Sequence, residues 1–388
     1  MNKKLVIVGG GFAGISAVQV FSRFRRCAEC MLIDRKDYFE FLPLLPDVIG
    51  GKIRSEFLRV SLPGLGRKLG FDFRKEVVEK VALPQKKIFT KNGPVDYDYL
   101  LVSCGSETNF YDNDAVGAGA CKLDSVEDAE RIAGKVDLDL YETYFISGGG
   151  YTGIEVAANL RMRLKKIEKR RRIIIVEGSP LLLGPLPGWM RGYAAAFLKR
   201  MEIEILVNTR VAGVEKDEVF LSTGERVSRS MLIWTAGVKT PDFLQRLDKR
   251  KTAQGRIVVD EHLKVDRFCF LAGDAASFDY AGKPLRMSVQ FAFTEGRHAA
   301  SSIIREIEGK EPMRYRPFDP GYILPMAEGG CGKALGANVR GRFALALHYL
   351  MSIYRSYGMK NRAGISGDLL KEHPIKVKLS KNGRKTDP

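Results

Sequence analysis

The sequence predicts an α/β protein built around two Rossmann-like dinucleotide-binding units, and three observations lead to this prediction. An apolar strand pattern followed by G-x-G-x-x-G and a helical pattern occurs twice, with first glycines at Gly9 and Gly148. Each unit has a second strand pattern that ends on an acid, Asp34 or Glu177. The 388 residues, 45% of them hydrophobic, suit two or three globular domains.

The first unit begins at the N-terminus of the sequence. Residues 4–8 are apolar and rich in β-branched side chains, which is typical of a buried strand. Residues 9–14 carry the glycines, and a helix is expected over residues 15–24. The second strand, residues 31–33, ends on Asp34, whose carboxylate is suited to accept hydrogen bonds from ribose hydroxyls.

The second unit repeats this order. A strand over residues 144–146 precedes the glycines of residues 148–153, and a helix is expected over residues 154–166. The next strand, residues 173–176, ends on Glu177. A single glycine motif is as often a structural turn as a binding site. The strand, helix and terminal acid present in both units favour dinucleotide binding.

The three glycines of each motif have different physical roles. The first permits a tight turn after the strand, the second lets the backbone approach a pyrophosphate, and the third lets helix and strand pack closely. The helix N-terminus then presents free N–H groups to the phosphates. These glycines are Gly9, Gly11 and Gly14 in the first unit and Gly148, Gly150 and Gly153 in the second.

Glu177 also bears on the choice of nicotinamide nucleotide. A carboxylate at this position repels the 2′-phosphate of NADP, and residues 178–180 offer no arginine to bind it. The basic run of residues 169–172 precedes the strand, where a solvated helix end is the simpler interpretation. The sequence therefore favours NADH over NADPH.

Three later segments end in small residues after an apolar strand pattern. Residues 97–106 and residues 231–237 each pass from such a strand into a glycine. Residues 268–274 end in Ala-Gly-Asp, and a carboxylate at Asp274 is suited to meet a ribityl hydroxyl. Taken alone, Gly-Asp after a strand is more often only a turn.

This order of motifs resembles the FAD-dependent pyridine nucleotide-disulfide oxidoreductase superfamily over about residues 1–310. The resemblance implies a discontinuous FAD-binding domain, residues 1–110 and 240–325, with an NADH-binding domain, residues 111–239, inserted within it. Residues 326–388 are then expected to form a C-terminal membrane-association region.

The resemblance also assigns cofactor contacts, with Val78 meeting adenine through its backbone. The implied FAD contacts are Gly9, Gly11, Gly14, Asp34, Val78, Gly105 and Asp274. The implied NADH contacts are Gly148, Gly150, Gly153, Glu177 and Gly237.

Disulfide reductases place a cysteine pair beside the flavin, and residues 34–46 contain no cysteine. The only C-x-x-C, residues 27–30, precedes the second strand and is interpreted as two packing thiols. The chain instead resembles the type II NADH dehydrogenases. The segments that carry this likeness are residues 33–45, 123–129, 150–157, 234–239 and 289–296.

Two candidate catalytic residues follow from this likeness. Gln290 and Ala292 match the quinone-site pattern Ala-Gln-x-Ala-x-Gln, whereas Thr294 stands at the second glutamine. A helix-capping or surface amide is the alternative for Gln290. Glu155 is expected in the first helical turn after the second glycine motif. It is interpreted as a nicotinamide contact, a proton relay for the quinone, or a carboxylate that stabilises the helix N-terminus.

The resemblance implies an enzyme of the respiratory chain. It would transfer hydride from NADH to FAD and then two electrons to a membrane quinone, without pumping protons. It would be a homodimer bound peripherally to the cytoplasmic side of the cell membrane. One alternative is a sulfide:quinone oxidoreductase, with Cys121 and Cys331 as candidate redox cysteines. Another is an NADH-dependent flavoprotein with a protein acceptor or a redox-controlled binding role.

The formal net charge of +17 indicates an anionic partner. The basic run of residues 161–172 lacks interleaved aromatic side chains, which argues against nucleic acid. In residues 341–357, apolar side chains recur at helical spacing, and basic residues flank them. We expect an amphipathic helix at an anionic membrane surface, with packing on the protein core or on a second copy as the alternative. His348, Ser352 and Arg355 form the opposite stripe.

Neither a metal site nor a membrane-spanning segment is expected from the sequence. The four histidines lie far apart, without the spacing of metal ligands. No signal peptide is recognised at the start of the sequence, and no apolar stretch approaches 18 residues. The six cysteines are scattered and are interpreted as reduced thiols.

Overall fold

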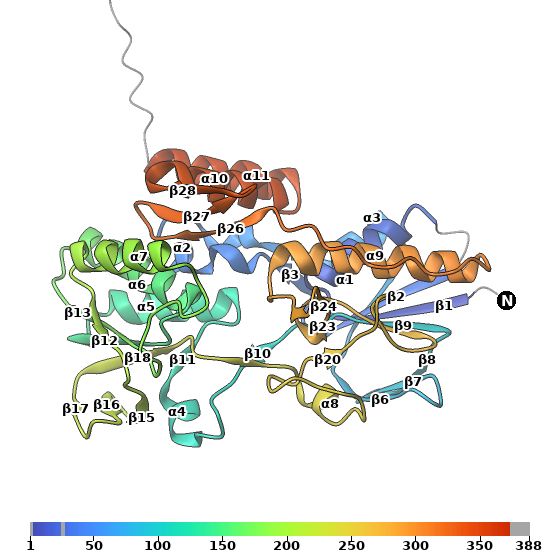
Figure 1. Cartoon of the computed structure of the whole chain (residues 1–388), viewed down its shortest axis with the longest axis horizontal. Coiled ribbons are helices and arrows are strands. Elements are labelled where there is room, and N and C mark those ends of the chain that lie inside the picture. Colours follow the sequence, from blue (N-terminus) through green and yellow to red (C-terminus); the bar gives the residue numbers. More distant parts are fainter. Residues whose placement is uncertain (1–2, 25–27, 373–388) are drawn as a thin grey trace, which may run out of the picture.

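The computed structural model describes residues 3–24 and 28–372. It confirms the predicted α/β class, because two parallel, Rossmann-like sheets lie side by side (Figure 1). The first sheet has the strand order β21, β22, β9, β1, β2 and β5, and the second has the order β11, β18, β12, β13 and β14. In each sheet, the strand that precedes a glycine motif is central, where both faces are buried.

The first sheet combines strands from two distant parts of the chain. Its strands are β1 (Lys3–Val8), β2 (Ala28–Asp34), β5 (Asp72–Lys75), β9 (Tyr99–Val102), β21 (Lys264–Asp266) and β22 (Cys269–Leu271). Strand β22 pairs in parallel with β9, so residues 269–271 complete a sheet that residues 3–102 begin.

The second sheet comes from the middle of the chain. Its strands are β11 (Cys121–Lys122), β12 (Thr143–Ser147), β13 (Arg172–Val176), β14 (Glu204–Leu206) and β18 (Ser230–Trp234). The pair β10 (Glu107–Thr108) and β19 (Val238–Lys239) joins the two segments that connect the units.

Each sheet is covered by helices on one face and by a small antiparallel sheet on the other. The helices on the first face are α1 (Phe12–Phe21), α2 (Leu45–Ile49), α3 (Leu62–Leu69), α5 (Val126–Asp137), α6 (Tyr151–Lys166), α7 (Gly188–Arg200) and α9 (Val289–Ile307). Two short helices, α4 (Asp114–Gly119) and α8 (Asp242–Gln245), instead pack against the small antiparallel sheets. The covering strands are β6 (Val78–Ala82), β7 (Lys87–Thr90), β8 (Gly93–Asp96), β15 (Val211–Glu215), β16 (Glu218–Leu221) and β17 (Arg226–Val227).

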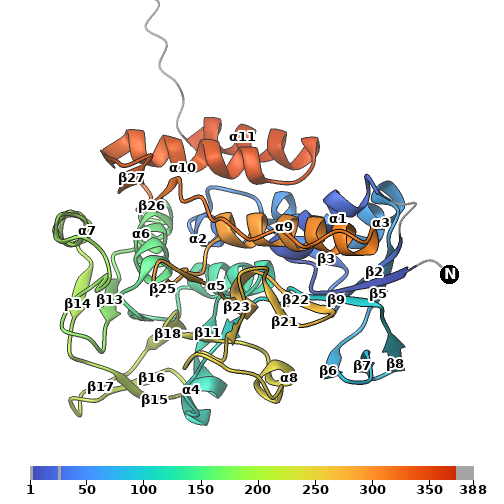
Figure 2. The same cartoon turned by 45° about the vertical axis from the view of Figure 1, so that its right-hand side comes forward.

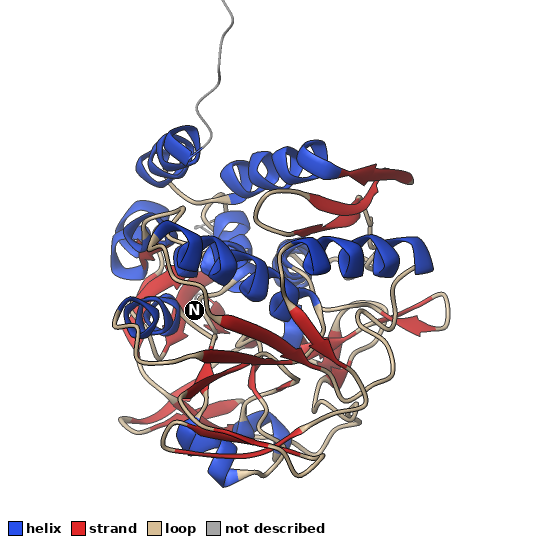
Figure 3. Ribbon diagram, turned by 90° about the vertical axis from the view of Figure 1, so that its left-hand side faces the viewer, coloured by secondary structure: helices blue, strands red, loops and turns tan. Residues whose placement is uncertain are grey.

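The central strands are apolar on both faces because two separate cores enclose them. Val6 and Val8 of β1 pack against the β6–β8 side, whereas Leu5 and Ile7 join the helix side. A single core of buried side chains on the helix side is continuous across both units. Figure 3 shows most helices on this side of the sheets.

The remaining short elements lie in the connections. Three strand pairs are β3 (Tyr38–Glu40) with β4 (Arg59–Ser61), β20 (Ile257–Val258) with β23 (Ala276–Ser277), and β24 (Asp279–Tyr280) with β25 (Lys283–Pro284). The 3₁₀ turns are Leu42–Leu44, Ser55–Leu58 and Gly273–Ala275.

The C-terminal region is larger than the single helix expected from the sequence. It contains β26 (Gly321–Pro325), β27 (Gly330–Ala334), β28 (Ala337–Arg340), α10 (Gly341–Arg355) and α11 (Met359–Glu372). Helix α10 packs on β26 and β27, and α11 packs on the turn at Ser55–Leu58. Figure 2 shows the two helices outermost, above α9 and α2. Residues 373–388 of the expected membrane-association region lie outside the described residues.

Two other expectations differ in detail. Helix α1 ends at Phe21 rather than at residue 24, because residues 22 and 23 form a turn. Helix α6 begins at Tyr151, directly after the second glycine, so Glu155 lies in its second turn. Among the described residues, no helix is both long and apolar enough to span a bilayer.

Candidate functional site

A cavity of about 480 Å³ opens at the carboxyl ends of the strands of the first sheet. This edge is where open α/β sheets bind their ligands, because loops and helix N-termini converge there. The residues that line the cavity come from both units, and they include Gly9, Gly11, Asp34, Gly105, Glu155 and Asp274.

The glycine turn at the cavity floor has no room for side chains at two of its three positions. Gly9 has a φ of +104°, and a Cβ atom there would lie 2.4 Å from the carbonyl oxygen of Ser103. A Cβ atom at Gly14 would lie 1.9 Å from the carbonyl oxygen of Gly9. At Gly11, no heavy atom lies within 4 Å of the Cβ position. The first and third glycines thus close the turn, and the second is open to a ligand.

Two carboxylates border this turn. Asp34 accepts hydrogen bonds from the backbone N–H groups of Gly10 (2.6 Å) and Lys36 (2.8 Å), which fix its position. Asp274 accepts a hydrogen bond from the Ser106 hydroxyl (3.1 Å), and burial raises its pKa. The open second glycine between a helix N-terminus and these carboxylates fits the pyrophosphate and hydroxyl groups of FAD.

A buried glutamate side chain fixes the backbone turn that carries Asp274. Glu295 of α9 accepts a hydrogen bond from the backbone N–H of Gly273 (2.7 Å). Glu295 is 2% exposed, and burial raises its pKa to about 8. Sequence reasoning did not single out this residue, because its partner lies 22 positions away.

The second unit repeats this construction. Gly148 has a φ of +107°, and a Cβ atom at Gly153 would lie 1.9 Å from the carbonyl oxygen of Gly148. Gly150 is open, as Gly11 is. Glu177 accepts hydrogen bonds from the N–H groups of Gly149 (2.7 Å) and Ser179 (2.7 Å). A second cavity, of about 580 Å³, is lined by Gly148 and Glu177 and fits the adenosine end of a nicotinamide nucleotide.

An arginine that sequence reasoning missed lies in the second cavity. Arg210 lines it together with Glu177, and its Nε atom is 3.2 Å from the Cβ position of Gly178. Residues 178–180 contain no arginine, but the fold brings Arg210 beside the end of β13. Arg210 is 32 positions beyond Gly178 and meets it because β14 returns beside β13.

Five of the assigned cofactor contacts do not line these cavities, namely Gly14, Val78, Gly150, Gly153 and Gly237. Val78 is buried at the start of β6 and does not line the first cavity. Gly237 has a φ of +80°, and a Cβ atom there would lie 2.1 Å from the hydroxyl oxygen of Tyr111. Tyr111 lines the second cavity, so Gly237 supports its wall.

Glu155 belongs to the second unit and yet lines the first cavity. Burial, followed by the charge of Asp47, raises its pKa well above the ordinary value. Because Glu155 lies beyond the first turn of α6, it does not stabilise the helix N-terminus, where the dipole effect is confined. The structure thus places a carboxyl group with a raised pKa in the wall of the first cavity.

Gln290 does not line the first cavity, although its neighbours Val289 and Ala292 do. Its amide oxygen accepts a hydrogen bond from the guanidinium of Arg355, at the end of α10. Thr294 shares a hydrogen bond of 2.8 Å with the hydroxyl of Tyr315. Gln290 thus joins α9 to the C-terminal helices at the edge of the cavity.

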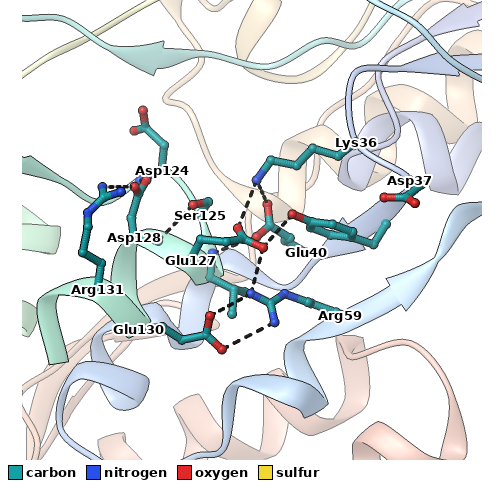
Figure 4. Close-up of polar contacts among 12 residues, drawn as sticks. Lys36, Asp37, Glu40, Arg59, Asp124, Ser125, Glu127, Asp128, Glu130 and Arg131 are labelled. Carbon is teal, nitrogen blue, oxygen red and sulfur yellow. Dashed lines mark hydrogen bonds and ion pairs between the residues drawn. The ribbon is translucent and has the colours of Figure 1, made fainter. Parts of the chain in front are cut away.

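An ionic network holds the two units together beside the cavity (Figure 4). Glu127 of α5 accepts hydrogen bonds from the Tyr38 hydroxyl (2.6 Å) and from Arg59 (2.8 Å). Lys36 pairs with Glu40 at 2.5 Å, and Glu40 accepts a hydrogen bond from the first N–H of α5 at 2.7 Å. These contacts fix α5 against the loop that forms one cavity wall.

Comparisons with known proteins agree with this geometry. The pyridine nucleotide-disulphide oxidoreductase family matches residues 3–296. The type II NADH:quinone oxidoreductase of Staphylococcus saprophyticus is 25% identical over 373 residues, which cover 88% of this chain and 92% of that protein.

Two solved structures show a similar fold. NDH2 from Plasmodium falciparum, solved in complex with NADH, has a TM-score of 0.84 at 18% identity and covers 96% of this chain and 98% of its own. The sulfide:quinone oxidoreductase of Aquifex aeolicus has a TM-score of 0.79 at 19% identity, with coverages of 97% and 96%.

The glycine geometry predicts different results for two alanine substitutions. Gly14→Ala places a methyl group against the carbonyl oxygen of Gly9, and we expect loss of bound flavin together with a lower melting temperature. Gly11→Ala projects into open space, so the protein should remain as stable without flavin but bind FAD at least about tenfold more weakly. Flavin absorbance measures FAD binding, and thermal unfolding of the FAD-free protein measures the melting temperature. Equal melting temperatures for the two variants would contradict this reading of the turn.

Glu295 predicts a pH dependence of stability. Its pKa is raised on folding, so its contribution is intact at acidic pH and is lost as the pH rises through about 8. Glu295→Gln, which is neutral throughout, should remove this loss, on the order of 4 kcal/mol over the full range. Urea unfolding of both proteins between pH 5 and about pH 9 measures the difference. Parallel curves would show that Glu295 does not titrate in this range.

Proposed function

We propose, since the chain belongs to the pyridine nucleotide-disulphide oxidoreductase family, that this FAD- and NAD-dependent oxidoreductase oxidises NADH and reduces a quinone. One observation carries the proposal: each unit has a complete dinucleotide cradle, by which we mean the glycine turn, the N-terminus of the helix that follows it and the acid at the end of the next strand. In both cradles the glycine before the helix, Gly11 or Gly150, has free space at its Cβ position. The S. saprophyticus relative, named as a type II NADH:quinone oxidoreductase, supports the choice of substrates.

The first cradle would hold FAD through Gly9, Gly11, Gly14, Asp34 and Asp274. When bound, FAD supplies the chemistry: it accepts a hydride from the nicotinamide and passes two electrons to the acceptor. Around it, the chain itself provides the helix N-terminus for the pyrophosphate, the carboxylates for hydroxyl groups, and apolar walls that exclude water.

We assign the second cradle to NADH, with Glu177 as the acceptor for the adenosine ribose hydroxyls. Both of its carboxylate oxygens are already held by backbone N–H groups, so the negative charge is fixed where a 2′-phosphate would enter. Arg210 lies in the same cavity and weakens the discrimination against NADPH that Glu177 provides. Gly105 and Gly237 are assigned to the loops that border the two cofactors.

Domain boundaries follow from the same assignment. We propose residues 1–110 and 240–325 as the FAD-binding domain, supported by the pairing of β22 with β9 in one sheet. Residues 111–239 would be the NADH-binding domain and residues 326–388 the membrane-association region. By family resemblance we also propose a homodimer.

Sulfide oxidation is disfavoured by the positions of the cysteines. Among the described residues, Cys104 is the one cysteine that lines the first cavity, and burial raises the pKa of its thiol to about 12. Cys121 and Cys331 are buried in β11 and β27, away from that cavity. Burial raises the pKa of Cys331 to about 11. Cys27, of the C-x-x-C, lies outside the described residues.

Helix α10 supports a membrane surface as the partner. Phe343, Leu350 and Tyr354 are 67%, 62% and 70% exposed, whereas Ser352 is buried and His348 and Arg355 face the protein. The apolar stripe thus points away from the core of this chain. Such a helix would lie in the headgroup region of an anionic membrane, and we place it on the cytoplasmic side of the cell membrane.

Anaerobic stopped-flow spectroscopy of the flavin tests the proposed reaction. We expect rapid bleaching by NADH, slower bleaching by NADPH, and return of the oxidised spectrum on addition of a short-chain quinone. Bleaching of the flavin by sulfide alone would indicate a sulfide:quinone oxidoreductase. Reduction by NADH without reoxidation by quinone would overturn quinone reduction and indicate a protein acceptor.

The exposed stripe of α10 gives a second prediction. Replacing Phe343, Leu350 and Tyr354 by serine should weaken binding to anionic vesicles by about 100-fold, because three apolar side chains no longer enter the bilayer. Oxidation of NADH by ferricyanide should be unchanged. The matched control replaces Leu138 and Leu140 by serine. These two exposed leucines follow α5 in the second unit, and this variant should bind vesicles as the wild type does. Equal vesicle binding by wild type and the α10 variant would rule out this surface.

A further inference from the structure

The second cavity contains a positively charged side chain that has no part in the transfer of hydride from NADH. Glu177 and Arg210 are the charged residues among those that line this cavity. Both carboxylate oxygens of Glu177 accept hydrogen bonds from backbone N–H groups. The guanidinium of Arg210, in contrast, has no ion pair or hydrogen bond within the described part of the chain. Its charge is therefore available to a ligand that enters the cavity.

The backbone at Arg210 is fixed on both sides. The N–H of the preceding residue, Thr209, donates to the carbonyl oxygen of Glu177 at 3.0 Å. The N–H of Arg210 donates to the hydroxyl of Ser222 at 3.0 Å, and the N–H of Ser222 donates to the carbonyl oxygen of Arg210 at 2.8 Å. Only the side chain of Arg210 therefore has to be ordered when a ligand binds.

The side chain of Arg210 lies across Gly178, the residue directly after Glu177. Its Nε, Cγ and Cδ atoms are 3.2, 3.3 and 3.8 Å from the Cβ position of Gly178. A side chain longer than a methyl group at residue 178 would displace the guanidinium. In dinucleotide-binding folds, an arginine near the end of this strand accommodates the 2′-phosphate of NADP. The glycine thus leaves room for a guanidinium that comes from a later part of the chain.

The two charged residues favour different nucleotides. Glu177 is suited to accept hydrogen bonds from the ribose hydroxyls of NADH, and its charge repels a 2′-phosphate. A guanidinium binds two phosphate oxygens at once through its planar fork of N–H groups, whereas a neutral 2′-hydroxyl offers it a single weaker acceptor. The unpaired guanidinium of Arg210 therefore matches NADPH better than it matches NADH.

Two simpler roles for Arg210 make different predictions. The guanidinium could stack on the adenine ring, which NADH and NADPH share, and would then act on both nucleotides alike. It could instead only mask the charge of Glu177, and its effect would then require that carboxylate. Both roles are separable from direct binding of the phosphate by experiment.

We propose that Arg210 binds the 2′-phosphate of NADPH, so that the second cradle accepts this 2′-phosphorylated nucleotide as a hydride donor in addition to NADH. This inference rests on the proposed assignment of the second cradle to a nicotinamide nucleotide. Glu177 retains the 3′-hydroxyl of the adenosine ribose as a partner. The redox chemistry balances as it does for NADH: NADPH gives up one hydride and becomes NADP⁺, and the two electrons go to bound FAD.

Arg210→Gln tests the role, because it removes the charge and keeps a polar side chain. The rates of anaerobic flavin reduction by NADH and by NADPH are measured over a range of nucleotide concentrations. We expect the preference for NADH over NADPH to rise at least about tenfold, almost entirely because NADPH binds more weakly. The rate at saturating NADPH should change little, since the phosphate is remote from the nicotinamide. Arg210→Lys, which keeps the charge without the fork, should restore part of the loss.

The matched control is Arg170→Gln, which removes the same charge from the same unit. Arg170 precedes β13, whereas the cavity lies at the other end of that strand, and its side chain is 88% exposed and pairs with Glu202 at 3.5 Å. An exposed pair of this kind contributes little. Arg170→Gln should leave the rates with both nucleotides unchanged.

Glu177→Gln distinguishes direct binding from masking. In this background, Arg210→Gln should still weaken NADPH binding at least about fivefold, because the contact with the phosphate does not involve the carboxylate. No effect of Arg210→Gln in the Glu177→Gln background would show that Arg210 only masks Glu177 and would overturn the proposal. Equal weakening of NADH and NADPH binding in the single variant would indicate stacking on adenine and would overturn it as well.

Calorimetry gives a readout that does not depend on turnover. Adenosine 2′,5′-bisphosphate and adenosine 5′-monophosphate are titrated into the FAD-loaded wild type and into Arg210→Gln. The variant should bind the bisphosphate at least about tenfold more weakly, with a much smaller change for the monophosphate. Equal affinities of both proteins for the bisphosphate would contradict the assignment of Arg210. Flavin reduction needs no quinone, so a protein that NADPH reduces but quinone does not reoxidise would overturn quinone reduction and support this inference. A protein that neither nucleotide reduces would overturn both.

Discussion

The structure depends on how closely a helix approaches the strand that precedes it. In both units this approach ends in a contact that no side chain tolerates, because the Cβ position of Gly14 or Gly153 lies 1.9 Å from a backbone oxygen. A backbone oxygen cannot turn aside as a flexible side chain can. The close approach directs the helix N-terminus at the cavity, and the acid at the end of the next strand then bonds the turn. The same close packing of helix and strand thus forms the glycine turn of both units.

The sequence predicts those features whose causes are close together in the chain. The glycine turns, the adjoining acids and the succession of strand, turn and helix in each unit follow from local spacing and alternation, and the fold class is confirmed. Glu295, Arg210 and Asp47 escaped prediction because each acts on a residue that only the tertiary fold brings near. The amphipathic pattern of α10 indicated a helix, but only its packing shows which stripe faces outward. Helix α11, with mixed polarity, gave no periodic signal.

The joint between the two units combines charge and apolar packing. Arg59 contacts Glu127 and Glu130 of α5, and Lys36 pairs with Glu40, so the loop after β2 and helix α5 share one network (Figure 4). The helix-side core continues beneath it without a break. Partly exposed ion pairs contribute little individually, and the continuous core supplies most of the stability of this joint. The network instead fixes the register of α5 against the cavity wall.

The position of Glu155 has a consequence for how this protein could be rebuilt. A carboxyl group that lines the first cavity is encoded by the helix of the second unit. Transplanting that whole unit from another protein, as a module that brings a new nucleotide preference, would also exchange a wall of the first cavity. The two cradles are therefore not interchangeable parts. A change of nucleotide preference is better sought in the loops around Glu177 and Arg210, which leave the shared wall intact.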